Sequence, residues 1–348
     1  MTDSFEDIST TQWFWKTGIP TDVIQPTTGD WQEDQLSDLA TMLCGMQIAL
    51  SLVTIALNIV LILAIRGWVQ LKRTSRVLLV NITVADIMIC LCFASRSALS
   101  LQGIETPVSC IIPTTIASWA ATSSITLILI LAIDTYRAAH FINLVSNNND
   151  NSSPVKLYSA IFVNWAFWAF VMVWAFCTSD NSVQVPCFFP NRYFDRYYVL
   201  FGSFIMIIMI PIIISFHIST VIVTSRRIRE VQNIAANNSG GPFNDSDASS
   251  GQVSFIIRMK VVQKLSTITF VVCIIFLCTW GTLIIALITH KLVVEIDGEY
   301  LVYIGILVNI NSASNFVVYF ARSSKFRQAL KQVFAMPRTV GPTPGMNT

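Results

Sequence analysis

Long, continuous runs of apolar residues dominate the chain, and polar residues collect between them. A helix needs about 20 mostly apolar residues to cross the hydrocarbon core of a membrane, and seven runs reach that length. Because the runs do not alternate with polar residues, helices are favoured over the strands of a membrane barrel. The pattern predicts an all-α membrane protein with a seven-transmembrane helix bundle in residues 41–322. The predicted spans are Thr41–Ile65, Val77–Leu101, Ser109–Ala139, Leu157–Cys177, Tyr197–Thr224, Val261–Ile288 and Glu299–Phe320.

The segments outside the spans differ in character. Residues 1–40 are polar and acidic and lack the pattern of a signal peptide, so they predict a tail. Residues 230–254 include a run rich in Asn, Ser and Gly, which predicts a flexible loop. Residues 323–335 place aromatic and apolar residues at helical spacing among basic ones, which predicts a short amphipathic eighth helix in contact with membrane lipids. Residues 336–348 are expected to be disordered.

Composition supports the membrane assignment. Only 12% of the 348 residues are charged and 53% are hydrophobic, whereas soluble domains carry about 25% charged residues. This argues against a soluble enzyme. The net charge of +2 gives no global basic field that would attract nucleic acid. The eight cysteines lack the paired spacing of a zinc site.

The charged residues are sorted by side of the membrane. Basic residues are enriched in cytoplasmic loops, and one set of alternate connecting segments holds 17 of the 22 basic residues. The other side, with the N-terminal tail, holds 14 of the 20 acids and a net charge of −9. We therefore expect the N-terminus, and the acidic tail with it, outside the cell and the C-terminus in the cytosol.

Asp86 is the only acid in the middle of a predicted span. Ionisable side chains at that depth are costly and are by default functional or structurally essential. Hydroxyl and amide side chains lie at a similar depth on other spans. Together with a carboxylate they suit a sodium ion or a hydrogen-bonded switch between helices. A protonated Asp86 that only helps helices to pack is the alternative. The companions are Asn58, Ser124, Asn311, Ser312 and Asn315.

Short motifs follow one another in a fixed order along the spans. The second span contains N-I-T-V-A-D at Asn81–Asp86, the third D-T-Y at Asp134–Tyr136, the sixth F-L-C-T-W at Phe276–Trp280, and the seventh N-S-A-S-N-F-V-V-Y at Asn311–Tyr319. They resemble the N-L-A-x-A-D, D-R-Y, F-x-x-C-W and N-S-x-x-N-P-x-x-Y segments of the rhodopsin-like G protein-coupled receptors. Asn58, Cys110 and Pro211 also match, and the resemblance covers about Met42 to Phe334, as in a divergent member of that family.

The resemblance implies a plasma-membrane receptor that binds an extracellular ligand and activates a heterotrimeric G protein. Thr135 stands where the family has its arginine, so the usual arginine contact to the G protein and the ionic lock to the sixth span cannot form as such. Phe316 and Thr282 replace two prolines, so the kinks expected there need another cause or are smaller. The implied switch and G protein contacts are Asp134, Thr135, Tyr136, Arg137, Lys264, Phe276 and Tyr319.

The resemblance also implies a disulfide between Cys110, at the start of the third span, and Cys187, in the loop of residues 178–196. Both would face an oxidising compartment. The bond would hold this loop over the mouth of the bundle.

In this family a ligand pocket opens between the outer halves of the helices. The absence of an acid at Ala117 argues against an amine ligand, and Asn309 replaces the lysine that holds retinal in opsins. Arg96 either points into the pocket or snorkels to the membrane surface. The implied pocket positions are Arg96, Ala117, Ser118, Ala121, Trp280, Leu283, Ile284, Gly305 and Asn309.

The outer charge of −9 favours a peptide ligand whose basic part is drawn to the bundle mouth and whose C-terminal end reaches Arg96 and Trp280. A chemosensory receptor for a small molecule is the first alternative. A non-signalling scavenger receptor of the same fold is the second, because of Thr135.

Other functional classes fit less well. A channel or transporter needs a polar path through the bundle, and an intramembrane enzyme needs a nucleophile and a base at membrane depth. His217, the only histidine well within a span, has no evident partner in the sequence and is interpreted as a packing residue. We expect no enzyme activity and no cofactor apart from a sodium ion at Asp86.

Overall fold

The computed structural model describes residues 29–68, 71–104, 106–141, 154–179, 196–238, 246–292 and 298–335. Helices make up almost all of these residues, and no strand occurs among them. The helices are α1 (Gly29–Gly67), α2 (Arg73–Leu101), α3 (Pro107–Phe141), α4 (Pro154–Cys177), α6 (Arg196–Asn238), α7 (Ser246–Leu292), α8 (Gly298–Arg322) and α9 (Ser324–Phe334).

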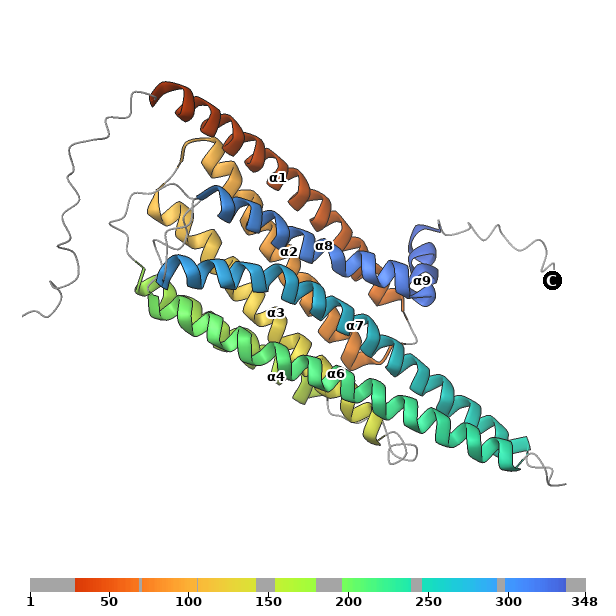
Figure 1. Ribbon diagram of the computed structural model, residues 1–348. Helices are drawn as coiled ribbons and strands as arrows, with labels where there is room; N and C mark the ends of the chain where they lie inside the picture. Colours follow the sequence, from red (N-terminus) through yellow and green to blue (C-terminus); the bar gives the residue numbers. More distant parts are fainter. Residues whose placement is uncertain are drawn as a thin grey trace, which may run out of the picture. The chain divides into compact units, whose positions relative to one another are not determined.

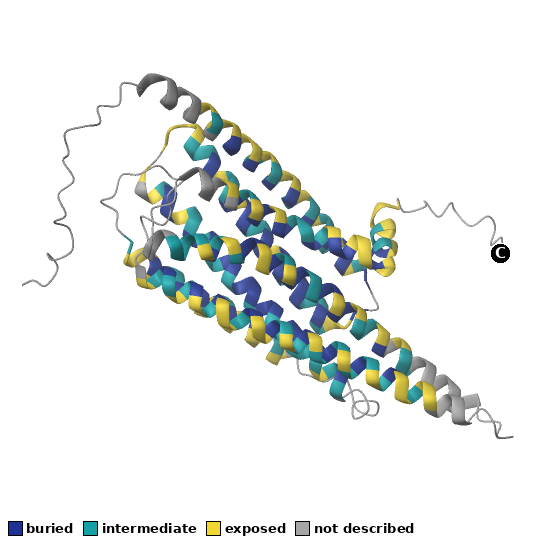
Figure 2. Cartoon of the chain, in the orientation of Figure 1, coloured by how far each residue is buried: buried dark blue, intermediate teal, exposed yellow. Residues whose placement is uncertain are grey.

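Six of the described helices, α1 to α4, α6 and α7, are long and apolar enough to cross a membrane. The predicted seventh span corresponds to α8, which has 25 residues. Large apolar side chains are exposed on the outward faces of the helices, while buried residues face the neighbouring helices (Figure 2). On α4, for example, Phe162 is 72% exposed and Phe170 is 73% exposed. Such a continuous apolar surface suits lipid rather than water.

Contacts divide the chain into two units, residues 1–40 and residues 41–348. The described part of the first unit, residues 29–40, is helical and forms the beginning of α1. The predicted tail therefore includes a helical segment. The rest of that tail, residues 1–28, and the predicted disordered end, residues 336–348, lie outside the described residues.

The flexible loop predicted for residues 230–254 is wrong for most of its length. Helix α6 continues to Asn238 and α7 begins at Ser246. Each residue added to an existing helix gains a backbone hydrogen bond, so a polar segment can extend a helix that it would not start. Toward this end of the two helices, Gln263 of α7 donates a hydrogen bond of 2.8 Å to Ser225 of α6. Figure 1 shows the two helices running side by side past the ends of their neighbours.

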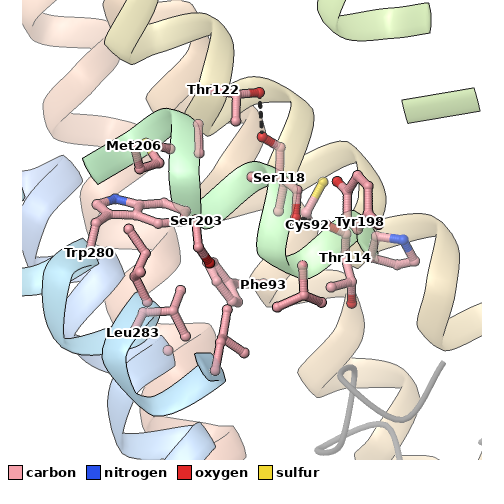
Figure 3. A pocket seen from close by; sticks show the side chains of 18 of the residues that line it. Cys92, Phe93, Thr114, Ser118, Thr122, Tyr198, Ser203, Met206, Trp280 and Leu283 are labelled. Atoms are coloured by element: carbon pink, nitrogen blue, oxygen red, sulfur yellow. Dashed lines mark hydrogen bonds between the residues drawn. The ribbon is translucent and has the colours of Figure 1, made fainter. Parts of the chain in front are cut away.

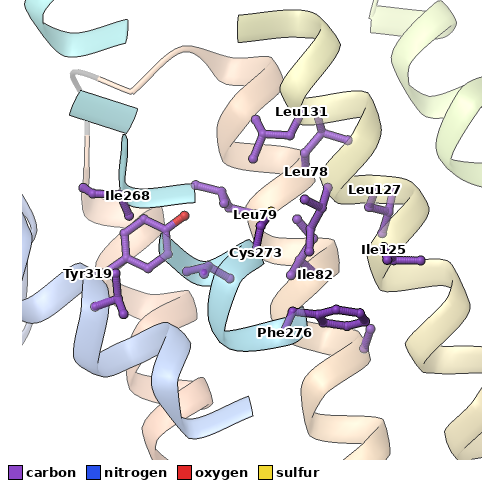
Figure 4. Packing of buried hydrophobic residues seen from close by; sticks show 14 of the residues in the cluster. Leu78, Leu79, Ile82, Ile125, Leu127, Leu131, Ile268, Cys273, Phe276 and Tyr319 are labelled. Atoms are coloured by element: carbon purple, nitrogen blue, oxygen red, sulfur yellow. The ribbon is translucent and has the colours of Figure 1, made fainter. Parts of the chain in front are cut away.

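The core of the second unit lies between α2, α3, α7 and α8. Leucine and isoleucine side chains of α2 and α3 interlock there with aromatic and aliphatic residues of α7 and α8 (Figure 4). This packing leaves the helices with one buried face each, as in other helix bundles. Members of the cluster include Leu78, Leu79, Ile82, Ile125, Leu127, Leu131, Ile268, Cys273, Phe276 and Tyr319.

Helix α9 packs against the bundle through the buried aromatic side chain of Phe326, and Ala329 and Leu330 belong to the same core. Ser323 caps the helix, because its hydroxyl accepts a hydrogen bond of 3.1 Å from the backbone N–H of Phe326. The ring of Phe326 is fully buried and contacts Trp68, Phe316 and Tyr319 at centroid distances of 6.5, 5.9 and 6.1 Å. Phe316, which stands where the resembled family has proline, therefore helps to hold α9.

Phe326→Ala is expected to destabilise this end of the bundle by about 3–5 kcal/mol, the usual cost of truncating a buried phenylalanine. Phe334→Ala is the matched control, because Phe334 on the same helix is 65% exposed. Thermal unfolding of the purified receptor in detergent measures both. Equal midpoints for the two variants would contradict the packing described here.

Candidate functional site

A cavity of about 150 Å³ lies between α2, α3, α6, α7 and α8. Its lining residues come from the last third of α2 and α7, from the first third of α6 and α8 and from the first half of α3. The cavity is therefore near the end of the bundle at which α3, α6 and α8 begin, called here the cavity end. Figure 3 shows Trp280 on one side of it and Thr114 and Tyr198 on the other.

The structure brings eight of the nine predicted pocket positions to this cavity. Asn309 is the exception: it lies one turn beyond Gly305 on α8, is fully buried, and is not part of the lining. The cavity does not extend to that turn of α8, so the prediction for Asn309 is wrong. Whether the cavity binds a ligand remains a prediction. The eight lining positions are Arg96, Ala117, Ser118, Ala121, Trp280, Leu283, Ile284 and Gly305.

Sequence reasoning missed the wall that α6 contributes. Its lining residues recur at intervals of three and four, which is one face of a helix. The whole span is apolar, so hydrophobicity alone does not distinguish this face from the others. A glycine next to a serine, with a tyrosine one turn earlier, is the signal that could have identified it. The residues are Tyr198, Val199, Gly202, Ser203 and Met206.

The hydroxyl groups along α3 have their hydrogens engaged. Thr114, Ser118 and Thr122 donate to backbone carbonyl oxygens one turn earlier, at 2.8, 3.0 and 2.8 Å; the last of these bonds is drawn in Figure 3. The hydroxyl oxygens can still accept hydrogen bonds from a ligand, but the hydroxyl hydrogens are already used within the helix. The rest of the lining is largely apolar.

Arg96 is the one charged residue of the lining. It is only 7% exposed, so it does not snorkel to the surface. Its guanidinium carbon lies 5.2 Å from the centre of the Phe93 ring, a distance typical of a cation–π contact. The only ion pair among the described residues joins Lys72 and Asp134, far along the chain from Arg96.

Trp280 and Phe276 couple the cavity to the core beneath it. Their rings are stacked, with centroids 5.7 Å apart and an interplanar angle of 16°. Trp280 lines the cavity, whereas Phe276 belongs to the buried cluster between the helices. A molecule that displaces Trp280 would therefore also disturb the packing of Phe276.

The predicted polar cluster is assembled in part. Asp86 accepts hydrogen bonds from Ser312 at 3.3 Å and from Asn315 at 2.5 Å, which join α2 to α8. Asn58 of α1 donates to the backbone oxygen of Ser312 at 3.2 Å.

Two members of the predicted cluster have no such contact. Ser124 and Asn311 are buried, but neither is hydrogen-bonded to Asp86 among the described residues. Both carboxylate oxygens of Asp86 are engaged by protein donors. Binding of sodium there stays a prediction.

The predicted switch residues separate into buried and exposed groups. Thr135 is buried and its hydroxyl donates to the backbone oxygen of Ala132 at 2.9 Å. Asp134 pairs with Lys72 of the α2 N-terminus at 3.2 Å. Tyr136 packs against the ring of Phe216, with centroids 5.4 Å apart.

The remaining switch residues follow the same division. Arg137 and Lys264 are exposed, whereas Phe276 and Tyr319 are buried. In this structure the exposed pair is thus the part of the predicted set that is open to a partner.

Polar contacts also connect α6 with α7 and α3 with α6. His217 is fully buried, and its Nδ1 lies 3.1 Å from Oγ of Ser266. The interpretation of His217 as a packing residue omitted this hydrogen bond, because its partner is 49 residues away in the chain. Arg227 donates to the backbone oxygen of His140 at 2.6 Å. These contacts hold α6 to its neighbours on both sides.

The structure describes only one of the two cysteines of the predicted disulfide. Cys110 is buried at the cavity end of α3 and is not among the free cysteines of the described residues. Cys187 lies outside the described residues. The pairing stays a prediction.

Comparison with known families gives one match. The model of the family described as "Serpentine type 7TM GPCR chemoreceptor Srsx" matches residues 51–334. The match begins inside α1 and ends at the last residue of α9, so it covers the cavity lining and the Asp86 cluster. It is a match to a chemoreceptor family rather than to the rhodopsin-like branch. A search of curated proteins finds no match.

Asn315→Leu is expected to lower stability by about 1–3 kcal/mol, because it leaves a buried carboxylate oxygen of Asp86 without its donor. Asn309→Leu is the matched control on the same helix. Neither amide atom of Asn309 has a hydrogen-bond partner among the described residues, so its replacement should be neutral or stabilising. Thermal unfolding of the purified variants measures both effects. A larger loss of stability in Asn309→Leu than in Asn315→Leu would contradict the role given to the Asp86–Asn315 hydrogen bond.

Proposed function

Because the chain belongs to the Srsx family of serpentine G protein-coupled chemoreceptors, we propose that it detects a small molecule in the cavity and activates a heterotrimeric G protein. It is a multi-pass membrane receptor and not an enzyme. The observation that carries the proposal is the small volume of the cavity.

The cavity suits a small ligand better than a peptide. An apolar cavity of about 150 Å³ holds a molecule of roughly the size of benzene, and the cavity between the helices has about that volume. A peptide would have to place most of its atoms outside it. The peptide expectation rested on the acidic outer segments, whereas the family match supports the chemosensory alternative.

The topology is part of the same proposal. With α8 as the seventh span the two termini lie on opposite sides of the plasma membrane, and the basic residues of the connecting segments favour a cytosolic C-terminus, so that the cavity end faces the extracellular side. Helix α9 then lies at the cytosolic surface, where Lys325 and Lys331 are exposed and suit anionic lipid head groups.

Signalling requires a ligand that binds one arrangement of the helices better than another. A ligand in contact with Trp280 shifts its ring and that of Phe276, and thereby the packing of α7 against α3. The hydrogen bond between the side chains of His217 and Ser266 ties α7 to α6, so the two helices move together. Their separation from α3 breaks the contact of Arg227 with His140 and opens the cytosolic face to the G protein.

A scavenger receptor is the second candidate, favoured by Thr135. The threonine hydroxyl is bonded within its own helix, and the neighbouring Asp134 is bound by Lys72 rather than by an arginine of the same motif. Such a receptor would bind the ligand without activating a G protein.

Filling the cavity tests the function. Cells that express the wild type are expected to show a second-messenger response to members of a panel of small metabolites. Ala117→Phe should weaken that response about tenfold or more, which corresponds to about 1.4 kcal/mol of binding, because the new ring occupies the ligand's volume. Val163→Phe is the control, since Val163 is 63% exposed on the outward face of α4.

The outcomes separate the two candidates. An unchanged response of Ala117→Phe would show that ligands act elsewhere. Ligand binding without any second-messenger response, both in the wild type and in Thr135→Arg, would support the scavenger instead.

A further inference from the structure

We propose that the ligand of the cavity carries a carboxylate group that binds to Arg96, with its apolar part directed toward Trp280. This inference rests on the proposed small-molecule function of the same cavity and names the class of ligand. It depends on one unusual feature, a buried cation that lines the cavity and has no anionic partner in the described part of the chain.

Arg96 is more than nine-tenths buried, which removes most of its hydration. Burying a charge without a partner is among the most costly arrangements in a protein. The contacts within the protein compensate for little of this cost. The ring of Phe93 covers one side of the guanidinium, and the thiol of Cys44 is close enough to interact with it. Neither is an anion-like acceptor of hydrogen bonds.

The side-chain amide of Gln47, which lies near Arg96, offers a free donor and no free acceptor. Oε1 of Gln47 accepts a hydrogen bond of 3.1 Å from Ser97, so the side-chain oxygen is engaged. Nε2 of Gln47 has no hydrogen-bond partner among the described residues. Gly305 lies beside both groups, because a Cβ atom at Gly305 would be 2.9 Å from Nε2 of Gln47 and 3.7 Å from a terminal nitrogen of Arg96. Gln47 of α1 and Arg96 of α2 therefore place N–H donors beside Gly305 of α8, and of these three residues Arg96 and Gly305 line the cavity.

The composition of the lining defines the rest of the ligand. One guanidinium fits one negative charge and binds two oxygens of a carboxylate in parallel. A phosphate dianion would need a second cation, and Arg96 is the only one in the lining. The other walls are mainly apolar, and the hydroxyl hydrogens of Thr114 and Ser118 are engaged with the backbone. The arrangement suits a small monocarboxylic acid with an apolar body.

Paired probes that differ only in charge test the proposal on the purified full-length receptor. Benzoate is expected to raise the midpoint of thermal unfolding of the wild type more than benzamide does. Phenyl phosphate is expected to raise the midpoint less than benzoate does. In Arg96→Met the advantage of benzoate should disappear, while the response to benzamide remains.

The unliganded variants give an independent readout. Arg96→Met should unfold at a higher temperature than the wild type, because it removes an unpaired buried charge. Arg76→Met is the matched control on α2. The guanidinium of Arg76 donates to the backbone oxygens of Trp68 and Leu71, both at 3.1 Å, so its loss should lower the midpoint and leave the preference for benzoate intact.

Several results would overturn the carboxylate assignment. These are equal effects of benzoate and benzamide on the wild type, a stronger effect of phenyl phosphate, a benzoate preference that survives in Arg96→Met, and a destabilised or unfolded Arg96→Met. A wild type that binds only the neutral probe would leave the small-molecule function in place while excluding the carboxylate. Probe binding that is unchanged in Ala117→Phe would instead place the binding site outside the cavity and argue against the proposed function.

Discussion

Hydrogen bonds between the carboxylate of Asp86 and the side chains of Ser312 and Asn315 determine how the second and the last long helix meet. Lipid supplies no donors to a carboxylate, so a group at this depth must find its partners inside the bundle. Asn58 extends the connection to α1 through the backbone of Ser312. Three helices are thereby fixed relative to one another, and the cavity on one side and the α9 docking site on the other both depend on their placement.

Two buried charged side chains of α2, Asp86 and Arg96, have different surroundings. Toward α9, Asp86 and Ser323 have their hydrogen bonds within the protein. Around the cavity, Arg96 lacks an anionic partner among the described residues, and so Gln47 and Arg96 together form a cluster of donors. Evolution tolerates such a local cost mainly where a binding partner compensates for it. This contrast supports the assignment of the cavity as the recognition site.

The departures from the rhodopsin-like motifs have structural replacements. Phe316 keeps its backbone N–H where a proline would lose it, and its ring stacks against Phe320 and contacts Phe326. Lys72, from the beginning of α2, provides the cation that Asp134 binds. In the proposed mechanism, signalling therefore depends on contacts other than the arginine of the D-R-Y motif. The contacts of His217 with Ser266 and of Arg227 with His140 are the described candidates.

The sequence by itself determined the helices, because a run of about 20 apolar residues has few alternatives to a membrane-spanning helix. It also indicated a receptor of the G protein-coupled class and identified Asp86, Ser312 and Asn315 as related positions, since motifs at fixed spacing survive in a one-dimensional pattern. The helical extensions at residues 230–238 and 246–254 were missed, because packing between neighbouring helices decides whether a polar segment remains helical. Only the tertiary structure showed that Asn309 is outside the cavity, that α6 forms one of its walls, and that Arg96 is buried with no anionic partner among the described residues. The volume of the cavity, which favours a small ligand over a peptide, likewise depends on how five helices pack together. The physical reason is that burial and enclosure depend on neighbours distant in the chain, which no local pattern records.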